Sequence, residues 1–143
     1  MIFDSTLLLS NAQAITADAA STNVIDLGAP GKVYGAGANL IRDIGKGKPI
    51  PLLVQVVEAF ATLTSLTVSL QVDDADTFGS PKTVWISPAI PVAELIAGKV
   101  VVPEYIPRGT NERYMRLYYD VTGSNATAGK ITAGVTMGNQ SNG

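Results

Sequence analysis

Leu66-Thr67-Val68-Ser69-Leu70-Gln71-Val72-Asp73 is a stretch in which apolar residues occupy every even position and polar residues every odd position. A period of two is typical of a β-strand that has one buried and one solvated face. The same alternation returns in residues 114–122 and 130–137, so these three segments are predicted to be strands. Their core-facing side chains should be Leu66, Val68, Leu70, Val72, Met115, Leu117, Tyr119, Val121, Ile131 and Val135.

Strand signals dominate the rest of the chain as well. Val, Ile and Thr, which fit a pleated and half-buried surface better than a helix, make up more than a quarter of the 143 residues. Residues 52–60 are almost wholly apolar, as in a strand that is covered on both faces. Only residues 92–97 favour a short helical turn, ended by a glycine. Shorter strands are predicted between turn sequences at 22–27, 83–87 and 99–102.

Seven or eight strands with one short helical turn predict an all-β fold, an antiparallel β-sandwich of the jelly-roll type. The chain has the length of one domain, and a domain of this size needs no disulfide or metal to stabilise its core. Residues 22–137 are predicted to form that domain. An irregular N-terminal arm, residues 1–21, should precede it, and a short polar tail, residues 138–143, should follow it.

The composition excludes several classes of function. The chain has no Cys and no His, which removes disulfides, thiolate and imidazole metal sites, and catalysis by Ser-His-Asp or Cys nucleophiles. A net charge of −2 does not give the basic surface that nucleic acid requires. Charged residues make up only 15% of the chain. A surface with so few charges suits a protein partly covered by neighbours, although a large core would give the same figure.

Targeting and membrane segments are not predicted. The first basic residue is Lys32, so the positive start of a signal peptide is missing, and the longest apolar stretch, 51–63, is interrupted by polar residues. That stretch is also shorter than the roughly 20 residues that span a bilayer. We therefore expect synthesis in the cytoplasm of a host cell and no membrane partner.

Three features resemble ligand sites without completing a motif. The glycine-rich segment 29–48 lacks the two glycine patterns that bind phosphates, and it is predicted to be a flexible excursion between two strands. Asp73, Asp74 and Asp76 cluster as calcium requires, but their spacing departs from the calcium-loop pattern, and an acidic turn after a strand is the alternative. Glycosidases need a matched pair of carboxylates, and no motif marks such a pair here. No catalytic residue, metal ligand or cofactor is assigned, and the protein is predicted not to be an enzyme.

Three segments carry residues suited to contact with a protein partner. Residues 114–118 place Tyr and Arg, the types enriched at interface hot spots, on one strand face, where ordinary cross-strand packing is the alternative. The cations of 29–48 suit an acidic partner, although Asp43 lies among them and a solvated loop is the alternative. The apolar N-terminal arm should be covered by its own sandwich, by a sister subunit or by the partner, and we favour the last two. The candidate contact residues are Phe3, Leu7, Leu8, Leu9, Arg42, Lys46, Lys48, Tyr114, Arg116 and Tyr118.

Several blocks of the chain, taken in order, are similar to a known family. They are residues 11–16 (NAQAIT), 19–28 (AASTNVIDLG), 42–49 (RDIGKGKP), 70–74 (LQVDD), 78–81 (FGSP), 95–98 (LIAG) and 112–117 (ERYMRL). Together they resemble the capsid cement, or decoration, proteins of tailed bacteriophages, of the type described in a Bordetella phage. The resemblance implies a small jelly-roll protein on the outer surface of an icosahedral head. Such a protein bridges major capsid protein subunits, stabilises the shell and has no catalytic activity.

The expected function is therefore that of a structural virion protein whose partner is the major capsid protein. Because shell proteins meet around symmetry axes, a homodimer or homotrimer is expected on the particle. The alternative is another phage virion or adhesion module, such as a head-fibre base, a tail component or a carbohydrate-binding domain. A β-sandwich hydrolase is a third class, which turnover of a glycan would reveal.

Overall fold

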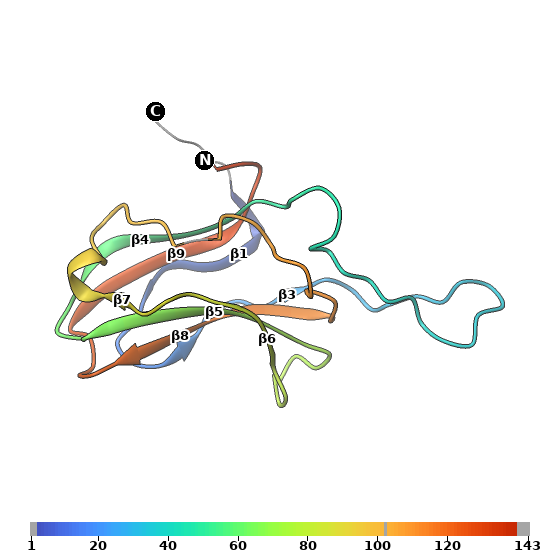
Figure 1. Ribbon diagram of the computed structural model, residues 1–143, viewed down its shortest axis with the longest axis horizontal. Helices are drawn as coiled ribbons and strands as arrows, with labels where there is room; N and C mark the ends of the chain where they lie inside the picture. Colours follow the sequence, from blue (N-terminus) through green and yellow to red (C-terminus); the bar gives the residue numbers. More distant parts are fainter. Residues whose placement is uncertain (1–2, 102, 140–143) are drawn as a thin grey trace.

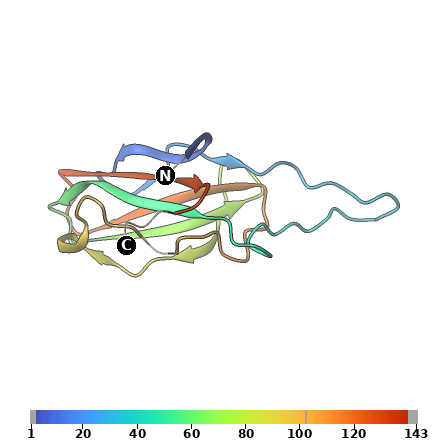
Figure 2. The same cartoon turned by 90° about the horizontal axis from the view of Figure 1, so that it is seen from above.

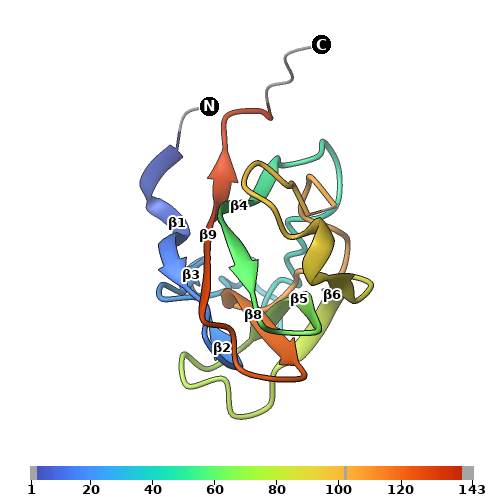
Figure 3. The same cartoon turned by 90° about the vertical axis from the view of Figure 1, so that its left-hand side faces the viewer.

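The computed structural model describes residues 3–101 and 103–139, which form two antiparallel β-sheets packed face to face (Figure 1). Within these residues there are nine strands. The first sheet has the order β1 (Phe3–Ala14), β9 (Ala128–Thr136), β4 (Leu52–Ala61). The second has the order β2 (Ala19–Ala20), β8 (Tyr114–Thr122), β5 (Ser65–Asp73), β6 (Lys82–Ile86), with β3 (Ile25–Asp26) beside β8 and β7 (Ile90–Pro91) beside β5. Figure 3 shows the two layers from one end.

The connections between the sheets follow the jelly-roll order. Residues 99–101 and 103–106 run antiparallel to β4, through the bridges Gln55↔Val100 and Pro51↔Tyr105. They add a fourth member to the first sheet, at its edge beside β4. If β2 with β3 and β6 with β7 each count as one interrupted strand, the nine strands reduce to seven, and the edge segment of residues 99–101 and 103–106 is the eighth. Their sheet orders are then 1-8-3-6 and 2-7-4-5, which is the arrangement of a jelly roll. The predicted fold class is confirmed.

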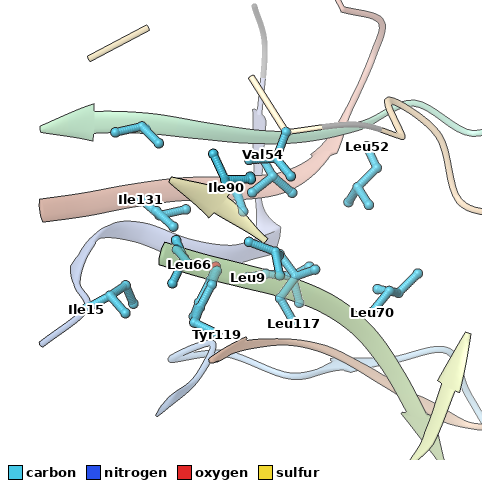
Figure 4. Close-up of a cluster of buried hydrophobic side chains, with 14 of the residues drawn as sticks. Leu9, Ile15, Leu52, Val54, Leu66, Leu70, Ile90, Leu117, Tyr119 and Ile131 are labelled. Atoms are coloured by element: carbon cyan, nitrogen blue, oxygen red, sulfur yellow. The ribbon is translucent and has the colours of Figure 1, made fainter. Parts of the chain in front are cut away.

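The core lies between the two sheets and follows the predicted alternation. The inward residues of β5 pair with inward residues of β8: Val68 with Tyr119, and Leu70 with Leu117. These side chains are fully buried, as is Ile131 on β9 (Figure 4). Of the ten residues predicted to face the core, eight are fully buried, while Val121 and Val135 are partly buried against it. The alternation therefore placed the core on the correct face of each strand.

The N-terminal segment differs from the prediction of an irregular arm. Residues 3–14 form β1, which pairs with β9 from Phe3↔Thr136 to Ala14↔Lys130, so the sandwich begins at Phe3 rather than at residue 22. Leu9 is fully buried in the core, and the Ser10 hydroxyl lies 2.8 Å from the hydroxyl of buried Tyr119. Burial raises the pKa of that tyrosine, since the charged form would lose its hydration. The chain thus covers its apolar N-terminus itself.

Irregular pairing explains why β1 was not predicted as a strand. The register between β1 and β9 shifts three times, and a bulge places an extra residue on one strand, which breaks the alternation of apolar and polar side chains. At one crossing Gly134 faces β1 so closely that a Cβ atom would lie 2.8 Å from the carbonyl oxygen of Leu7. A side chain at position 134 would push β1 away from the sheet.

The remaining elements match the sequence predictions in outline. The predicted strand at 22–27 is confined to β3, and the predicted strand at 83–87 corresponds to β6. The helical turn is a 3-10 helix, Val92–Glu94. The described part of the chain contains no helix long and apolar enough to cross a bilayer. Of the predicted polar tail, only residues 138–139 are within the described residues.

Candidate functional site

The candidate contact residues lie in three separate places rather than on one surface. Four belong to β1, three to the loop between β3 and β4, and three to β8. On β1, Leu9 is in the core, and Phe3, Leu7 and Leu8 are half-buried along the sheet. These four were predicted to contact a partner or a sister subunit, and that prediction is wrong for Leu9, because its side chain is fully occupied inside the sandwich.

The loop between β3 and β4 extends far from the end of the sandwich, as Figures 1 and 2 show. We call residues 29–42 the projecting loop; every one of them is exposed. Two backbone hydrogen bonds close it, from Leu40 N–H to the Gly31 carbonyl (2.8 Å) and from Ala36 N–H to the Val33 carbonyl (2.9 Å). The loop is therefore a narrow, internally bonded excursion rather than a cover over either sheet.

Polar contacts fix the base of the projecting loop, which we call the foot. The foot consists of Asp26, Gly28, Arg42, Asp43, Gly45, Gly109 and Arg113. Arg113, just before β8, holds Asp26 through two hydrogen bonds of 2.9 Å and thereby lowers the pKa of that carboxyl to about 2. The same carboxylate accepts a hydrogen bond from Gly28 N–H, and the Gly28 carbonyl accepts one from Arg42, at 2.7 Å. We call the part of the loop that follows β3 its outgoing leg and the part that leads to β4 its returning leg. These contacts tie the two legs to each other and to the segment that precedes β8.

Asp43 fixes the returning leg. Its carboxylate accepts hydrogen bonds from the backbone N–H groups of Gly109 (2.8 Å) and Gly45 (2.9 Å), and these donors, Gly109 first, lower the pKa of the carboxyl. Gly45 lies so close to Pro107 that a Cβ atom at position 45 would overlap the Pro107 carbonyl. The Asp43 carboxylate is consequently held by the fold, and it forms none of the three ion pairs among the described residues.

Apolar packing completes the foot. A pocket of about 240 Å³ lies beneath the loop, between the sheets, and its lining is wholly apolar. Both legs of the loop contribute to this lining, as do the two sheets. The lining residues are Leu7, Ile25, Leu27, Ile44, Ile50, Ile106, Met115 and Val135.

The foot predicts a local effect of removing the Asp43 carboxylate. In Asp43→Ala, amide exchange at Gly45 and Gly109 and protease cleavage within residues 29–48 should accelerate, while the free energy of unfolding falls by only about 1 kcal/mol, because the carboxylate is half-exposed. Since the folded protein lowers the pKa of Asp43, its contribution is complete at neutral pH and is lost as the pH falls through that lowered pKa.

Asp76→Ala is the matched control for this measurement. It removes an exposed carboxylate from a nearby turn and should leave exchange and proteolysis of the loop at the wild-type rate. Equal rates in the two variants would show that Asp43 does not hold the foot.

Arginine stacking organises the outer face of β8. The guanidinium of Arg116 lies over the ring of Phe78, 4.1 Å from its centroid, and its Nε donates to Gln71 at 2.9 Å. Burial lowers the pKa of Arg116. Tyr118, whose ring centroid is 5.8 Å from this guanidinium, and Tyr114 at the start of β8 are half-buried. The predicted strip of three residues is on one face, but Arg116 is already covered by the chain's own β5–β6 turn.

The acidic cluster at the end of β5 is rearranged relative to the prediction. Carboxylate oxygens of Asp73, Asp74 and Glu112 lie within 4.8 Å of one another, whereas Asp76 is outside the group. The Asp73 carboxylate accepts hydrogen bonds from the N–H groups of Ala75 and Ser80, which lower its pKa, so this carboxylate closes the turn. Asp73 thus lies in an acidic turn after a strand, the alternative to a calcium loop for this segment.

Sequence patterns missed two features of these surfaces. The projecting loop carries four exposed apolar residues: Val33 and Tyr34 on its far part, and Leu40 and Ile41 on the part that returns toward β4. Their only signal in the sequence is a set of apolar residues scattered among glycines. Phe78 adopts a positive φ of 50° and turns onto Arg116, a contact that no local pattern indicates. The loop was correctly predicted as an excursion between strands that carries exposed cations.

The chain was compared with families and with curated proteins. The family model described as Bbp16 matches residues 9–135, which include part of β1, all strands from β2 to β8, and nearly all of β9. The name of this family indicates a Bordetella phage protein. No curated protein matches the chain.

Proposed function

The chain belongs to the Bbp16 family, and from this membership we propose that it is a capsid cement protein of a tailed phage. It binds the outer surface of an icosahedral head and bridges major capsid protein subunits. It carries out no chemical reaction and needs no cofactor. The family name, which indicates a phage structural protein, and the seven sequence blocks that resemble phage cement proteins support this proposal.

The observation that carries the proposal is the projecting loop on its fixed foot. A bridging protein needs two contact surfaces separated in space. The loop supplies one of them at a distance from the sandwich (Figure 1), and the outer face of β8, with its half-buried Tyr114 and Tyr118, supplies another. Because the foot ties the loop to the segment before β8, a load on one surface passes through the sandwich to the other.

Many weak contacts are enough for this function. A standard interface buries about 800 Å² on each partner, and a shell carries many copies, so the contributions of individual molecules add over the particle. We propose that the copies sit as homodimers or homotrimers on the outer surface of the virion. Their partners are then the major capsid protein and one another, without nucleic acid or membrane.

Particles that lack this protein test the proposal. They should release DNA at a lower temperature and after milder osmotic shock or chelator treatment than wild-type particles. Adding the purified protein should restore the wild-type release. If depleted and complete particles release DNA identically in all three treatments, or if the protein fails to bind depleted particles, the protein is not a cement.

The rings of Tyr114 and Tyr118 favour an adhesion module as the second candidate. Aromatic side chains that are only partly buried on a sheet face also suit the flat side of a sugar. Binding to a glycan array, lost in Tyr118→Ala and absent from capsid particles, would support adhesion instead of cementing.

A further inference from the structure

We propose that the projecting loop itself docks into the capsid protein, in a groove that has an apolar floor and carboxylates along its rim. This inference rests on the proposed cementing function and adds to it the element that makes the contact and the chemistry of the partner surface. Three observations carry it: exposed apolar residues along the loop, an excess of positive charge on the loop and on the segment that follows it, and a fixed direction.

The projecting loop exposes more apolar surface, along its length, than an isolated loop needs. Tyr34 is 104% exposed and Ile41 is 87% exposed, while Val33 and Leu40 are each more than half exposed. Single exposed apolar residues are common in proteins, but a group of four on one narrow excursion marks a contact surface. The partner surface must therefore offer an apolar floor.

Charge defines the rim of the partner surface. Residues 29–48 carry Lys32, Arg42, Lys46 and Lys48 against the single carboxylate of Asp43, so this segment has a net charge of +3 while the whole chain has −2. None of the three ion pairs among the described residues involves these cations. Asp43 is engaged by backbone N–H groups. Carboxylates on the partner would complement this excess.

The foot fixes the direction in which the loop points. Contacts from Arg42 to Gly28 and from Asp43 to Gly109 hold both legs, and the tip is closed by its own backbone hydrogen bonds. An element that is already ordered loses less conformational entropy on binding than a free chain does. Its order and fixed direction therefore favour insertion of the loop into a groove of the partner.

A second copy of this chain fits the loop less well than the capsid protein does. Two grooves at the opposite end of the sandwich are apolar, but Glu94 and Lys99 are the charged residues in both, and they pair with each other at 3.3 Å. The groove at the foot, about 470 Å³, includes the loop's own Arg42. None of these grooves offers an apolar floor with an excess of carboxylates.

Photo-crosslinking identifies what the tip touches. The full-length protein with benzoylphenylalanine in place of Tyr34 is bound to capsids that lack the protein and is then irradiated. We expect crosslinks to an acidic segment of the major capsid protein. Crosslinks only between copies of this chain, or none on decorated particles, would overturn the inference. So would equally tight binding of the wild-type protein to anionic lipid vesicles or to DNA.

Substitutions measure how much the loop contributes to decoration. Tyr34→Ser combined with Ile41→Ser should weaken binding to capsids at least tenfold without changing the melting temperature, since both side chains are exposed. Lys46→Gln combined with Lys48→Gln should weaken it less and reduce its dependence on salt. The controls are Ile96→Ser and Lys99→Gln, at the opposite end of the sandwich, where Ile96 is 60% exposed.

The two proposals fail in different ways. If the wild-type protein does not bind depleted capsids, cementing itself is wrong. If the wild-type protein binds and both loop variants bind as tightly as the two controls, the cementing proposal stands and the docking role of the loop is wrong.

Discussion

Removing the first nine residues should unfold the sandwich rather than detach a docking segment. The deletion takes away fully buried Leu9, half-buried Leu7 and Leu8, and much of the β1–β9 pairing. Loss of one buried Leu side chain alone costs about 2–5 kcal/mol. Since a whole domain is stable by only about 5–15 kcal/mol, the truncated chain should be largely unfolded or insoluble.

Circular dichroism and urea unfolding of the truncated protein measure this effect. Ser5→Ala is the matched control on the same strand, because Ser5 is exposed, and it should leave the free energy of unfolding within about 0.5 kcal/mol of wild type. A truncated protein with the wild-type midpoint would mean that β1 is dispensable, and the N-terminal segment would again be available for a partner.

The fold class could be predicted because the central strands obey a simple rule. Each of β5, β8 and β9 has one face toward the opposite sheet, so burial alternates along the chain and is visible in the sequence. Leu70 and Leu117 illustrate the result: each was placed inward from its own strand, and the structure pairs them directly.

The edge of the first sheet could not be predicted in the same way. β1 pairs with β9, which lies at the other end of the chain, and the register shifts between them erase the alternation. Its stability comes from this distant pairing and from contacts such as Ser10 with Tyr119. No local window contains both partners. The run Leu7-Leu8-Leu9 therefore looked like an uncovered apolar segment, although its own sandwich covers it.

The candidate site was predictable in composition but not in shape. Clustered glycines indicated an excursion between strands, and Arg42, Lys46 and Lys48 are exposed, as a contact surface requires. Whether such an excursion folds over the sandwich or projects from it depends on its foot. The foot is made by Asp26 with Arg113 and by Asp43 with Gly109, pairs that are far apart in the sequence.

Residues that are distant in the sequence also cover Arg116 and thereby change its role. Taken alone, alternation places it on the outer face of β8, free for a partner. The β5–β6 turn brings Phe78 over its guanidinium, and Gln71 accepts its hydrogen bond. Arg116 consequently positions Phe78 and the turn that contains it. Tyr114 and Tyr118, the other two residues of this face, are half-buried like Arg116, and the guanidinium of Arg113 lies 5.0 Å from the ring centroid of Tyr114.

Replacing Leu117 with alanine should cost about 2–5 kcal/mol of unfolding free energy, because the side chain is fully buried and the change leaves a cavity. Leu117 faces Leu70 across the β5–β8 ladder, so Leu70→Ala should cost a similar amount. Since the two side chains are neighbours, the double variant should depart from additivity by at least about 0.5 kcal/mol. Urea unfolding of the four proteins measures all of these quantities.

Thr122→Ala separates burial from strand position in this experiment. Thr122 is exposed at the end of the same strand, and its replacement should change the unfolding free energy by no more than about 0.5 kcal/mol. Because Leu117 lies inside the sandwich, away from both proposed contact surfaces, Leu117→Ala should still decorate capsids at temperatures where it is folded. If Leu117→Ala and Thr122→Ala lower the free energy of unfolding equally, the inner face of β8 does not form the core. The alternation of apolar and polar residues would then not report which side chains stabilise the fold.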